Sequence, residues 1–346
     1  MMAPSTLRRR HRLTWGLRLI GLVLLVILII RVDFAEVYHL MRQADLRLVA
    51  LTVAAIVPLI LVKTVRWQIL LRAQDVRYAL WPAFLAYFGS LFVGFLTPGR
   101  LGEFVKAFHV QKECNISLAR AVSSVLADRL FDLCALLTVG MAAIFALPAI
   151  PGSAKAGVVA ALVLLVIPAI LFLYAPLFER VQRWVTDPHH SSTWRANYSG
   201  GIGHLLFGPR GWLTEIHLSL RRLTRSNLLI SSLLTVVAYA LFFVQCYLLA
   251  LALGLSAGFA PVTLAIALGS LITLVPISIS GLGTRDAVLI AYLGTAGVSA
   301  EAALSFSLLV FFAFYLGGGL LGLLAWWLKP APWSELRAEQ QAAHAG

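Results

Sequence analysis

Two short stretches place charge, proline and glycine in the middle of long apolar runs, and these interruptions constrain the fold most strongly. The first is residues 95–103, Phe-Leu-Thr-Pro-Gly-Arg-Leu-Gly-Glu, and the second is residues 276–286, Pro-Ile-Ser-Ile-Ser-Gly-Leu-Gly-Thr-Arg-Asp. Charge in hydrocarbon is costly, and a broken helix at membrane depth persists only where its freed backbone groups face protein or a wet cavity. One such segment in each half of a chain indicates a transporter-type substrate site.

The composition is that of an integral membrane protein. The chain has 346 residues, of which 60% are hydrophobic and 12% charged, whereas a soluble domain is about 25% charged. Its net charge of +13 would suggest a nucleic-acid partner in a soluble protein, but most of the basic residues lie in short loops between apolar runs. We therefore expect no nucleic-acid partner. Because the sequence shows no metal-ligand spacing and no Walker-type phosphate loop, we also expect no metal and no cofactor.

Apolar runs of about 20 residues predict spanning helices. We expect six full spans, near residues 13–31, 48–70, 119–147, 155–177, 227–253 and 302–328. Segments 82–110 and 261–294 are also apolar, but each carries its break in the middle. The first limb of each would rise by about 22 to 24 Å as a helix, most of the way across a core of roughly 30 Å. The expected fold is all-α and polytopic, with about six full transmembrane helices and two inverted re-entrant hairpins.

The distribution of basic residues predicts the orientation. The loop 179–226 carries Arg180, Arg183, Arg195, Arg210, Arg221, Arg222 and Arg225. With the N-terminus in the cytoplasm, the extracytoplasmic segments hold few cations, namely Arg31, Arg42, Arg47 and Lys155. We therefore expect a bacterial cytoplasmic (inner) membrane protein with both termini cytoplasmic. Full crossing by both broken segments would also give an even number of spans, so the charge rule does not decide between re-entry and spanning.

We treat residues 1–346 as a single transmembrane domain. It comprises a basic N-terminus over 1–12, a membrane part over 13–328 that includes loop 179–226, and a cytoplasmic tail over 329–346.

The first break places a cation at the start of a helix. Thr97 is well placed as the N-cap of a helix that restarts at Pro98. Arg100 then lies in the first turn, where the helix dipole disfavours a cation, so it needs an anion. A protein carboxylate or a substrate phosphate would supply that charge. Glu103 and Lys106 follow at spacings of three, along one side of the same helix. The alternative is an internal salt-bridge cluster that only holds the hairpin together.

The second break repeats this pattern. Gly281 and Gly283 are positions of backbone freedom, and Thr284 can cap the next helix. Asp286 in the first turn suits the helix dipole, whereas Arg285 opposes it. The residues expected to form the two breaks are Thr97, Pro98, Gly99, Gly102, Pro276, Gly281, Gly283 and Thr284.

A third group of charges lies within the expected span 119–147. Asp128 and Asp132 are one helical turn apart, where like charges repel, so they require a cation or a shared proton. Arg129 is one partner, and Arg100 or Lys106 of the hairpin is the expected facing partner. The alternative is a packing clamp between helices. The candidate substrate-binding residues are Arg100, Glu103, Lys106, Asp128, Arg129, Asp132, Ser280, Arg285 and Asp286. Lys63 and Arg66-Trp67 are expected to anchor a cytoplasmic helix end.

Four short motifs, taken in order, resemble the lysylphosphatidylglycerol synthase transmembrane-region family, also called flippase-like or UPF0104 proteins. They are Arg66-Trp67, Pro98-x-Arg100-x-Gly102-Glu103, Asp128-Arg129-x-x-Asp132 and Gly281-Leu-Gly-x-Arg285-Asp286. The likeness covers roughly residues 50–328. The family is similar to the lipid-translocating half of multiple-peptide-resistance proteins, and it includes relatives linked to polyprenyl-phosphate glycan pathways and hopanoid metabolism.

Two departures from the family pattern bear on function. Asp286 stands where the family more often has Glu, and no soluble aminoacyl-transferase domain follows Leu328. The resemblance therefore implies lipid handling rather than lysyl-lipid synthesis. We expect translocation of an anionic or aminoacylated phospholipid, or of a polyprenyl-phosphate-type lipid, with no catalytic residues.

Two other functions remain open from the sequence. One is an intramembrane transferase that uses a polyprenyl-phosphate donor. The other is a lipid-binding subunit of a membrane synthase or glycosyltransferase partner. The sequence leaves open the lipid, the direction of transfer, the coupling ion and the oligomeric state.

Overall fold

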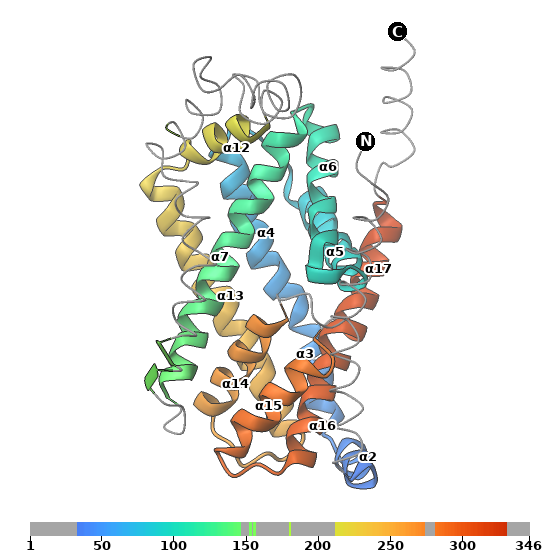
Figure 1. Ribbon diagram of the computed structural model, residues 1–346. Coiled ribbons are helices and arrows are strands. Elements are labelled where there is room, and N and C mark those ends of the chain that lie inside the picture. Colours follow the sequence, from blue (N-terminus) through green and yellow to red (C-terminus); the bar gives the residue numbers. More distant parts are fainter. Residues whose placement is uncertain are drawn as a thin grey trace, which may run out of the picture.

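The computed structural model describes residues 33–146, 152–153, 155–156, 180, 212–273 and 281–330, and its named elements are all helical (Figure 1). They are α2 (Phe34–Arg42), α3 (Leu46–Ala54), α4 (Ile56–Arg72), α5 (Leu80–Leu96), η1 (Pro98–Phe104), α6 (Val105–Cys114), α7 (Leu118–Phe145), α12 (Trp212–Arg221), α13 (Arg225–Ala252), α14 (Phe259–Ile272), α15 (Thr284–Gly294), α16 (Ala300–Phe311), η3 (Phe312–Gly317) and α17 (Gly318–Leu328). The all-α prediction is confirmed for this part of the chain.

Three helices of the described chain are long and apolar enough to cross a membrane. They are Leu46–Arg72, Arg225–Ala252 and Ala300–Leu328, and they coincide with three expected spans. α7 is equally long, at 28 residues, but carries the charged group at Asp128 in its middle. The expected spans 13–31 and 155–177 lie outside the described residues. The protein is thus an integral membrane protein built on long apolar helices.

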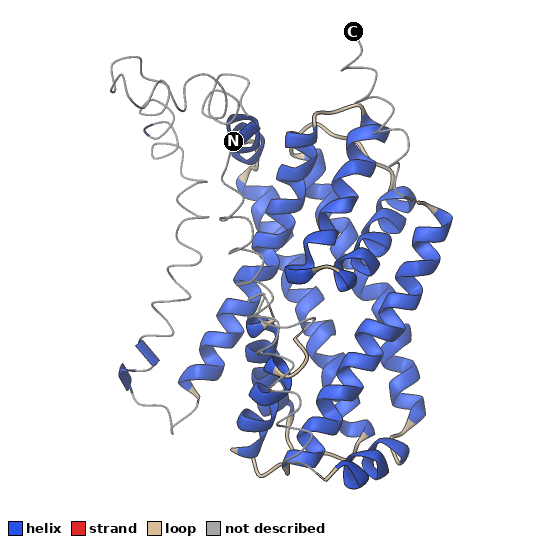
Figure 2. Ribbon diagram, turned by 45° about the vertical axis from the view of Figure 1, so that its right-hand side comes forward, coloured by secondary structure: helices blue, strands red, loops and turns tan. Residues whose placement is uncertain are grey.

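Each interrupted segment forms a pair of short helices. The first pair is α5 with the continuous η1–α6, and the second pair is α14 with α15. α5 ends before Thr97 and packs against η1 and α6, and α14 packs against α15. Figure 1 shows α5 and α6 in the upper half of the bundle and α14 and α15 in the lower half. Figure 2 shows the same bundle from a second side, with short loops between its helices. Each pair packs against long helices, α5 against α4 and α17, and α14 against α7 and α13.

A hydroxyl group and a glycine form the first break. The Thr97 backbone is extended, with φ −108° and ψ 140°. Its hydroxyl accepts a hydrogen bond from the Gly102 N–H at 2.7 Å and donates one to the Val93 carbonyl at 3.1 Å. A Cβ at Gly102 would lie 2.4 Å from that carbonyl oxygen. The helix restarts at Pro98 as expected, but as a 3₁₀-helix, and Arg100 has a left-handed φ of 57°.

The second break is capped one residue earlier than expected. Gly283, with φ 80°, is the N-cap of α15, and Thr284 is the first helical residue. The prediction that Thr284 caps the helix is therefore wrong. Asp286 is the third residue of α15, and its carboxylate accepts a hydrogen bond from the Gly283 N–H at 2.8 Å. This is the bond that the third helical residue makes in a capping box. Pro276 and Ser280 lie outside the described residues.

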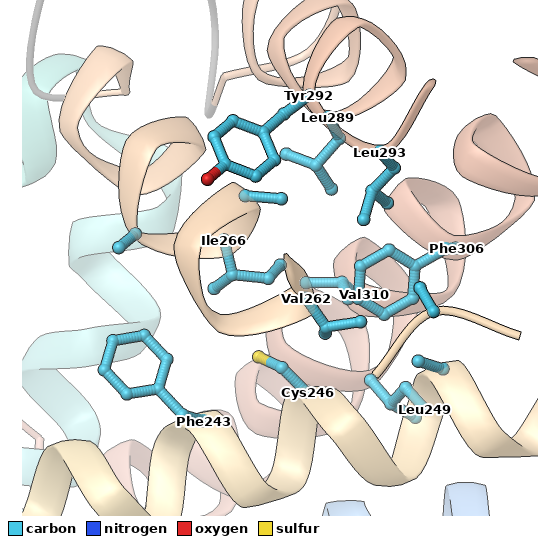
Figure 3. Packing of buried hydrophobic residues seen from close by; sticks show 14 of the residues in the cluster. Phe243, Cys246, Leu249, Val262, Ile266, Leu289, Tyr292, Leu293, Phe306 and Val310 are labelled. Atoms are coloured by element: carbon cyan, nitrogen blue, oxygen red, sulfur yellow. The ribbon is translucent and has the colours of Figure 1, made fainter. Parts of the chain in front are cut away.

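The apolar core that holds the second pair of short helices is formed by α13, α14, α15 and α16. Figure 3 shows Cys246 and Leu249 of α13 against Ile266 of α14, with Leu293 and Phe306 closing the cluster. On the other side of the bundle, α17 packs against α5. A Cβ at Gly322 would lie 2.9 Å from the Phe88 carbonyl oxygen, so the helices approach as small-residue packing predicts.

Candidate functional site

A buried ion cluster connects α4, α7 and the first pair of short helices. Its centre is Arg66 of α4, whose Nη2 lies 2.6 Å from Asp128 Oδ1 and 2.8 Å from Asp132 Oδ1. The side chains of Arg66 and Asp128 are completely buried. One guanidinium therefore bridges the two carboxylates that share a face of α7, and their mutual repulsion is offset.

Two lysines complete the pairing of these carboxylates. Lys106 Nζ lies 2.7 Å from Asp128 Oδ2, and Lys63 Nζ lies 3.1 Å from both oxygens of Asp132. The hydroxyl of Tyr87 also donates to Asp128 Oδ2, at 2.9 Å. Charge-assisted bonds of this kind are the strong ones in a low-dielectric interior, so α7 is held by contacts on both sides.

Arg129 extends the ion cluster toward the middle of the bundle. Its Nη1 lies 2.7 Å from Glu103 Oε2, and its Nη2 lies 3.1 Å from Asp132 Oδ2. Glu103 is almost fully buried, whereas the Arg129 side chain is 25% exposed. The ion cluster, as the term is used below, consists of Lys63, Arg66, Glu103, Lys106, Asp128, Arg129 and Asp132.

Arg100 lies apart from the ion cluster. Its Nη2 donates to the Tyr315 hydroxyl at 3.1 Å, and its guanidinium lies 5.7 Å from the ring centroids of Phe95 and Tyr315. Within the described ranges, no carboxylate lies within 4 Å of it. Of the two expected partners, Arg100 and Lys106, it is Lys106 that faces Asp128, at 2.7 Å. The prediction assumed a regular helix from Pro98, and the left-handed backbone at Arg100 breaks that regularity.

Arg285 and Asp286 form a second, smaller ion pair. Arg285 Nη2 lies 3.2 Å from Asp286 Oδ1 and donates to the Ser307 carbonyl at 2.9 Å. Its Nε donates to the Ser307 hydroxyl at 3.2 Å, and that hydroxyl donates to Asp286. The Asp286 side chain is thus held by Gly283, Arg285 and Ser307, which fixes Arg285 at the start of α15.

A cavity of about 150 Å³ lies between the two pairs of short helices. The described charged residues that line it are Lys63, Arg100, Glu103, Arg129 and Arg285, and most of the remaining wall is aliphatic or aromatic. Arg100 comes from the first break and Arg285 from the helix that follows the second. The two interruptions therefore deliver one arginine each to the same apolar cavity.

A row of aromatic rings connects these two arginines. The rings of Phe95 and Tyr315 are 4.6 Å apart, and those of Tyr315 and Phe311 are stacked at 4.8 Å. Arg285 lies 5.9 Å from the Phe311 ring, and Arg100 contacts the opposite end of the row. Tyr315 belongs to η3, a π-helical turn, and such turns occur frequently at functional sites.

Of the sequence candidates, five meet in the ion cluster, namely Glu103, Lys106, Asp128, Arg129 and Asp132. Arg285 and Asp286 form the separate pair, and Ser280 lies outside the described residues. Sequence reasoning missed Lys63 and Arg66, which were expected at a membrane surface. Lys63 and Arg66 are three residues apart on one expected span, and Asp128 and Asp132 are four residues apart on another. Both spacings put the two side chains on one face of a helix. Two cations on one face and two carboxylates on the other could have indicated that the two helices pair.

Comparison with known proteins confirms the resemblance drawn from the four motifs. A family model described as lysylphosphatidylglycerol synthase TM region matches residues 15–322. A UPF0104 membrane protein of Methanothermobacter thermautotrophicus is 26% identical over 294 residues, which cover 81% of this chain and 85% of that protein. A second one from the same organism is 22% identical over 334 residues, covering 92% and 93%. A UPF0104 membrane protein of Pyrococcus horikoshii is 29% identical over 117 residues, covering 33% and 35%.

Proposed function

Because this chain belongs to the lysylphosphatidylglycerol synthase TM region family, we propose that it moves an amphiphilic lipid from one leaflet of the membrane to the other. The substrate is an anionic or aminoacylated phospholipid, or a polyprenyl-phosphate-type lipid. The observation that carries the proposal is the cavity, which Arg100 and Arg285 both line and whose wall is otherwise largely apolar. A site of this composition suits a headgroup phosphate that is attached to hydrocarbon.

The two pairs of short helices are re-entrant hairpins in this proposal. α5 has 17 residues and α14 has 14, which correspond to rises of about 25 and 21 Å. Neither length crosses a core of roughly 30 Å with ease. The first hairpin enters from the cytoplasm and the second from the opposite side, so that their turns meet near the midplane. With six full spans, both termini are then cytoplasmic.

The headgroup passes through the cavity while the acyl or prenyl tails stay in the bilayer. Carrying a phosphate through hydrocarbon alone would leave its charge without a counterion, which is prohibitive. Arg100 and Arg285 supply that counterion in the middle of the path. The first-turn N–H groups of α15 add to the field that favours an anion. Glu103 and Asp286 neutralise neighbouring arginines when the headgroup has left.

A reconstitution experiment tests the proposal. Purified protein is placed in liposomes that carry a fluorescent anionic phospholipid, and transfer is followed by quenching the outer leaflet with a membrane-impermeant reagent. Arg100→Gln should insert and purify like the wild type, since Arg100 has no carboxylate partner in the described chain, but should lose lipid transfer. Arg222→Gln is the matched control, because Arg222 is exposed and pairs with Asp75 away from the cavity.

Four outcomes are informative. Loss of transfer in Arg100→Gln and normal transfer in Arg222→Gln supports the proposal. Undiminished transfer by a well-folded Arg100→Gln protein contradicts it. Bound lipid without any transfer by the wild-type protein would favour a lipid-binding subunit, and a chemically altered lipid would favour the transferase.

A further inference from the structure

The ion cluster carries more positive than negative groups. Its four cations are Lys63, Arg66, Lys106 and Arg129, and its three carboxylates are Glu103, Asp128 and Asp132. With every group in its ordinary ionised form, one positive charge is in excess. Arg100 adds a second, since no carboxylate of the described residues lies within 4 Å of it. The Arg285–Asp286 pair is balanced.

The wall of the cavity carries more cations than carboxylates, since its described charged residues are Lys63, Arg100, Arg129, Arg285 and Glu103. Within the ion cluster, the side chains of Arg66, Lys106 and Asp128 are completely buried, and the two cations share the one carboxylate. Lys63 and Arg129 are the partly exposed cations, at 16% and 25%, and both line the cavity together with Arg100. Whatever occupies the cavity therefore faces a wall with a net positive charge.

This charge balance specifies the occupant. An unmatched cation in a low-dielectric interior is costly, and an anion of equal charge removes that cost. A phosphodiester headgroup carries one negative charge and would leave one cation unmatched. A phosphomonoester carries about 1.5 to 2 negative charges at pH 7. Resting on the proposed function, we infer that the cavity selects a lipid that ends in a dianionic phosphate, such as a phosphomonoester, over a phosphodiester lipid.

The arrangement of donors agrees with this charge. Arg100 donates from Nη2 to Tyr315, and Arg285 donates from Nε and Nη2 to Ser307 and Asp286. In the described chain, the other Nη atom of each arginine donates to no protein group. Each guanidinium thus keeps N–H donors that no described protein group accepts, and the cavity-lining Arg100 and Arg285 bring them to the cavity from opposite ends of the aromatic row. The apolar remainder of the cavity wall favours a phosphate borne by a lipid over free phosphate.

The test compares two lipids that differ by one methyl group and one charge. Dioleoyl phosphatidate is the phosphomonoester and dioleoyl phosphatidylmethanol is the phosphodiester, and inorganic phosphate is the soluble control. Binding to the full-length protein in neutral detergent at pH 8 is measured by native mass spectrometry and by competition. We expect phosphatidate to bind about tenfold more tightly than phosphatidylmethanol, because one further charge pair forms. Inorganic phosphate at the same concentration should not displace it.

Variants separate this inference from the proposed function. Arg100→Gln removes one of the two unmatched charges, so the preference should fall to about one- to twofold, whereas Arg222→Gln should keep it. Equal binding of the two lipids to the wild-type protein would overturn the inference and leave translocation intact. Displacement by inorganic phosphate would overturn the assignment to a lipid. Failure of the wild-type protein to bind either lipid would remove both the inference and the proposed function.

Discussion

The guanidinium of Arg66 lies 2.6 Å from the carboxylate of Asp128, and both side chains are completely inaccessible to solvent. Arg66 belongs to α4 and Asp128 to α7, so the pair joins two long helices at the centre of the bundle. The same guanidinium also pairs with Asp132, since its Nη2 lies 2.8 Å from Asp132 Oδ1. A buried pair of this kind is a weak source of net stability, but losing one partner is severe because the other charge is left unmatched.

We therefore expect Arg66→Met to destabilise the protein by about 3 to 5 kcal/mol. Asp128→Asn should also destabilise it, because Lys106 and Arg66 both lose a carboxylate. The double variant Arg66→Met/Asp128→Asn should cost clearly less than the sum of the two single changes. Thermal unfolding in detergent, read by size-exclusion chromatography of the surviving protein, measures all three.

A second pair of changes provides the control for this cycle. Arg100 makes no contact with Asp128, so Arg100→Gln and Asp128→Asn should have additive effects, within about 0.5 kcal/mol. If Arg100 and Asp128 proved strongly coupled while Arg66 and Asp128 did not, the ion cluster would be assigned incorrectly.

Glycine at position 102 is required by the close approach of η1 to α5. The Cβ of an alanine there would lie 2.4 Å from the Val93 carbonyl oxygen and 2.7 Å from the Gly94 nitrogen, both of which are backbone atoms. Because the backbone must move, Gly102→Ala should cost about 1 to 3 kcal/mol and weaken the Thr97–Gly102 hydrogen bond. The readout is the unfolding temperature in detergent.

Gly294→Ala is the matched control for that change. Gly294 ends α15, and a Cβ there would meet no atom within 4 Å. Alanine is the better helix former, so this change should be neutral or stabilising by up to about 1 kcal/mol. Equal loss of stability in both variants would show that the contact at Gly102 is not the cause.

The end of α17 is tied to the first hairpin through a tyrosine outside the spanning helices. The Tyr78 hydroxyl donates to Glu113 at 3.1 Å and accepts from Lys329 Nζ at 2.9 Å. Burial, and then the negative charge of Glu113, raise the pKa of Tyr78 above its ordinary value. The folded state therefore favours the protonated phenol. This contribution is present below the ordinary pKa of about 10, and it falls as the pH rises above that value.

Tyr78→Phe should accordingly cost about 1 kcal/mol near neutral pH. The difference between the wild type and this variant should be constant between pH 6 and 9, and it should shrink above pH 10, where the unfolded phenol ionises. Denaturation midpoints across this pH series measure it. A difference that grows above pH 10 would contradict the raised pKa.

The long helices were predictable because each follows from an unbroken local pattern. The spans expected at 48–70, 227–253 and 302–328 match helices at 46–72, 225–252 and 300–328 to within about two residues. The breaks at Thr97 and after Thr273 follow from proline and glycine, which interrupt a helix wherever it is packed.

The candidate site was harder to predict because it depends on contacts between distant segments. The position of Arg66 near the end of an expected helix predicts an anchor at the membrane surface. Only its contacts with α7 make it the centre of the ion cluster. The direction of Arg100 depends on a single left-handed backbone angle, which an arginine in the sequence does not signal. Local patterns therefore identified most of the charged residues, but not their pairing.

The topology can be tested at four exposed positions that bracket the two proposed hairpins. Ala79 and Lys112 flank the first hairpin, and Ser256 and Ala296 flank the second. Single cysteines are placed at these positions after the native Cys114, Cys134 and Cys246, which are all free thiols, have been replaced by alanine. A membrane-impermeant thiol reagent is then applied to intact cells, and the same reagent is applied to permeabilised cells as the control for reactivity.

Re-entry predicts that the two positions on either side of one hairpin behave alike. Ala79→Cys and Lys112→Cys should both be shielded in intact cells, because the basic loops predict that this face is cytoplasmic. Ser256→Cys and Ala296→Cys should both be labelled. If segment 82–110 instead crossed the membrane once, Ala79 and Lys112 would lie on opposite sides and only one of them would react. A pattern in which each pair agrees but the labelled pair is the first one would preserve the hairpins and invert the orientation. The pairs thus test re-entry and sidedness separately.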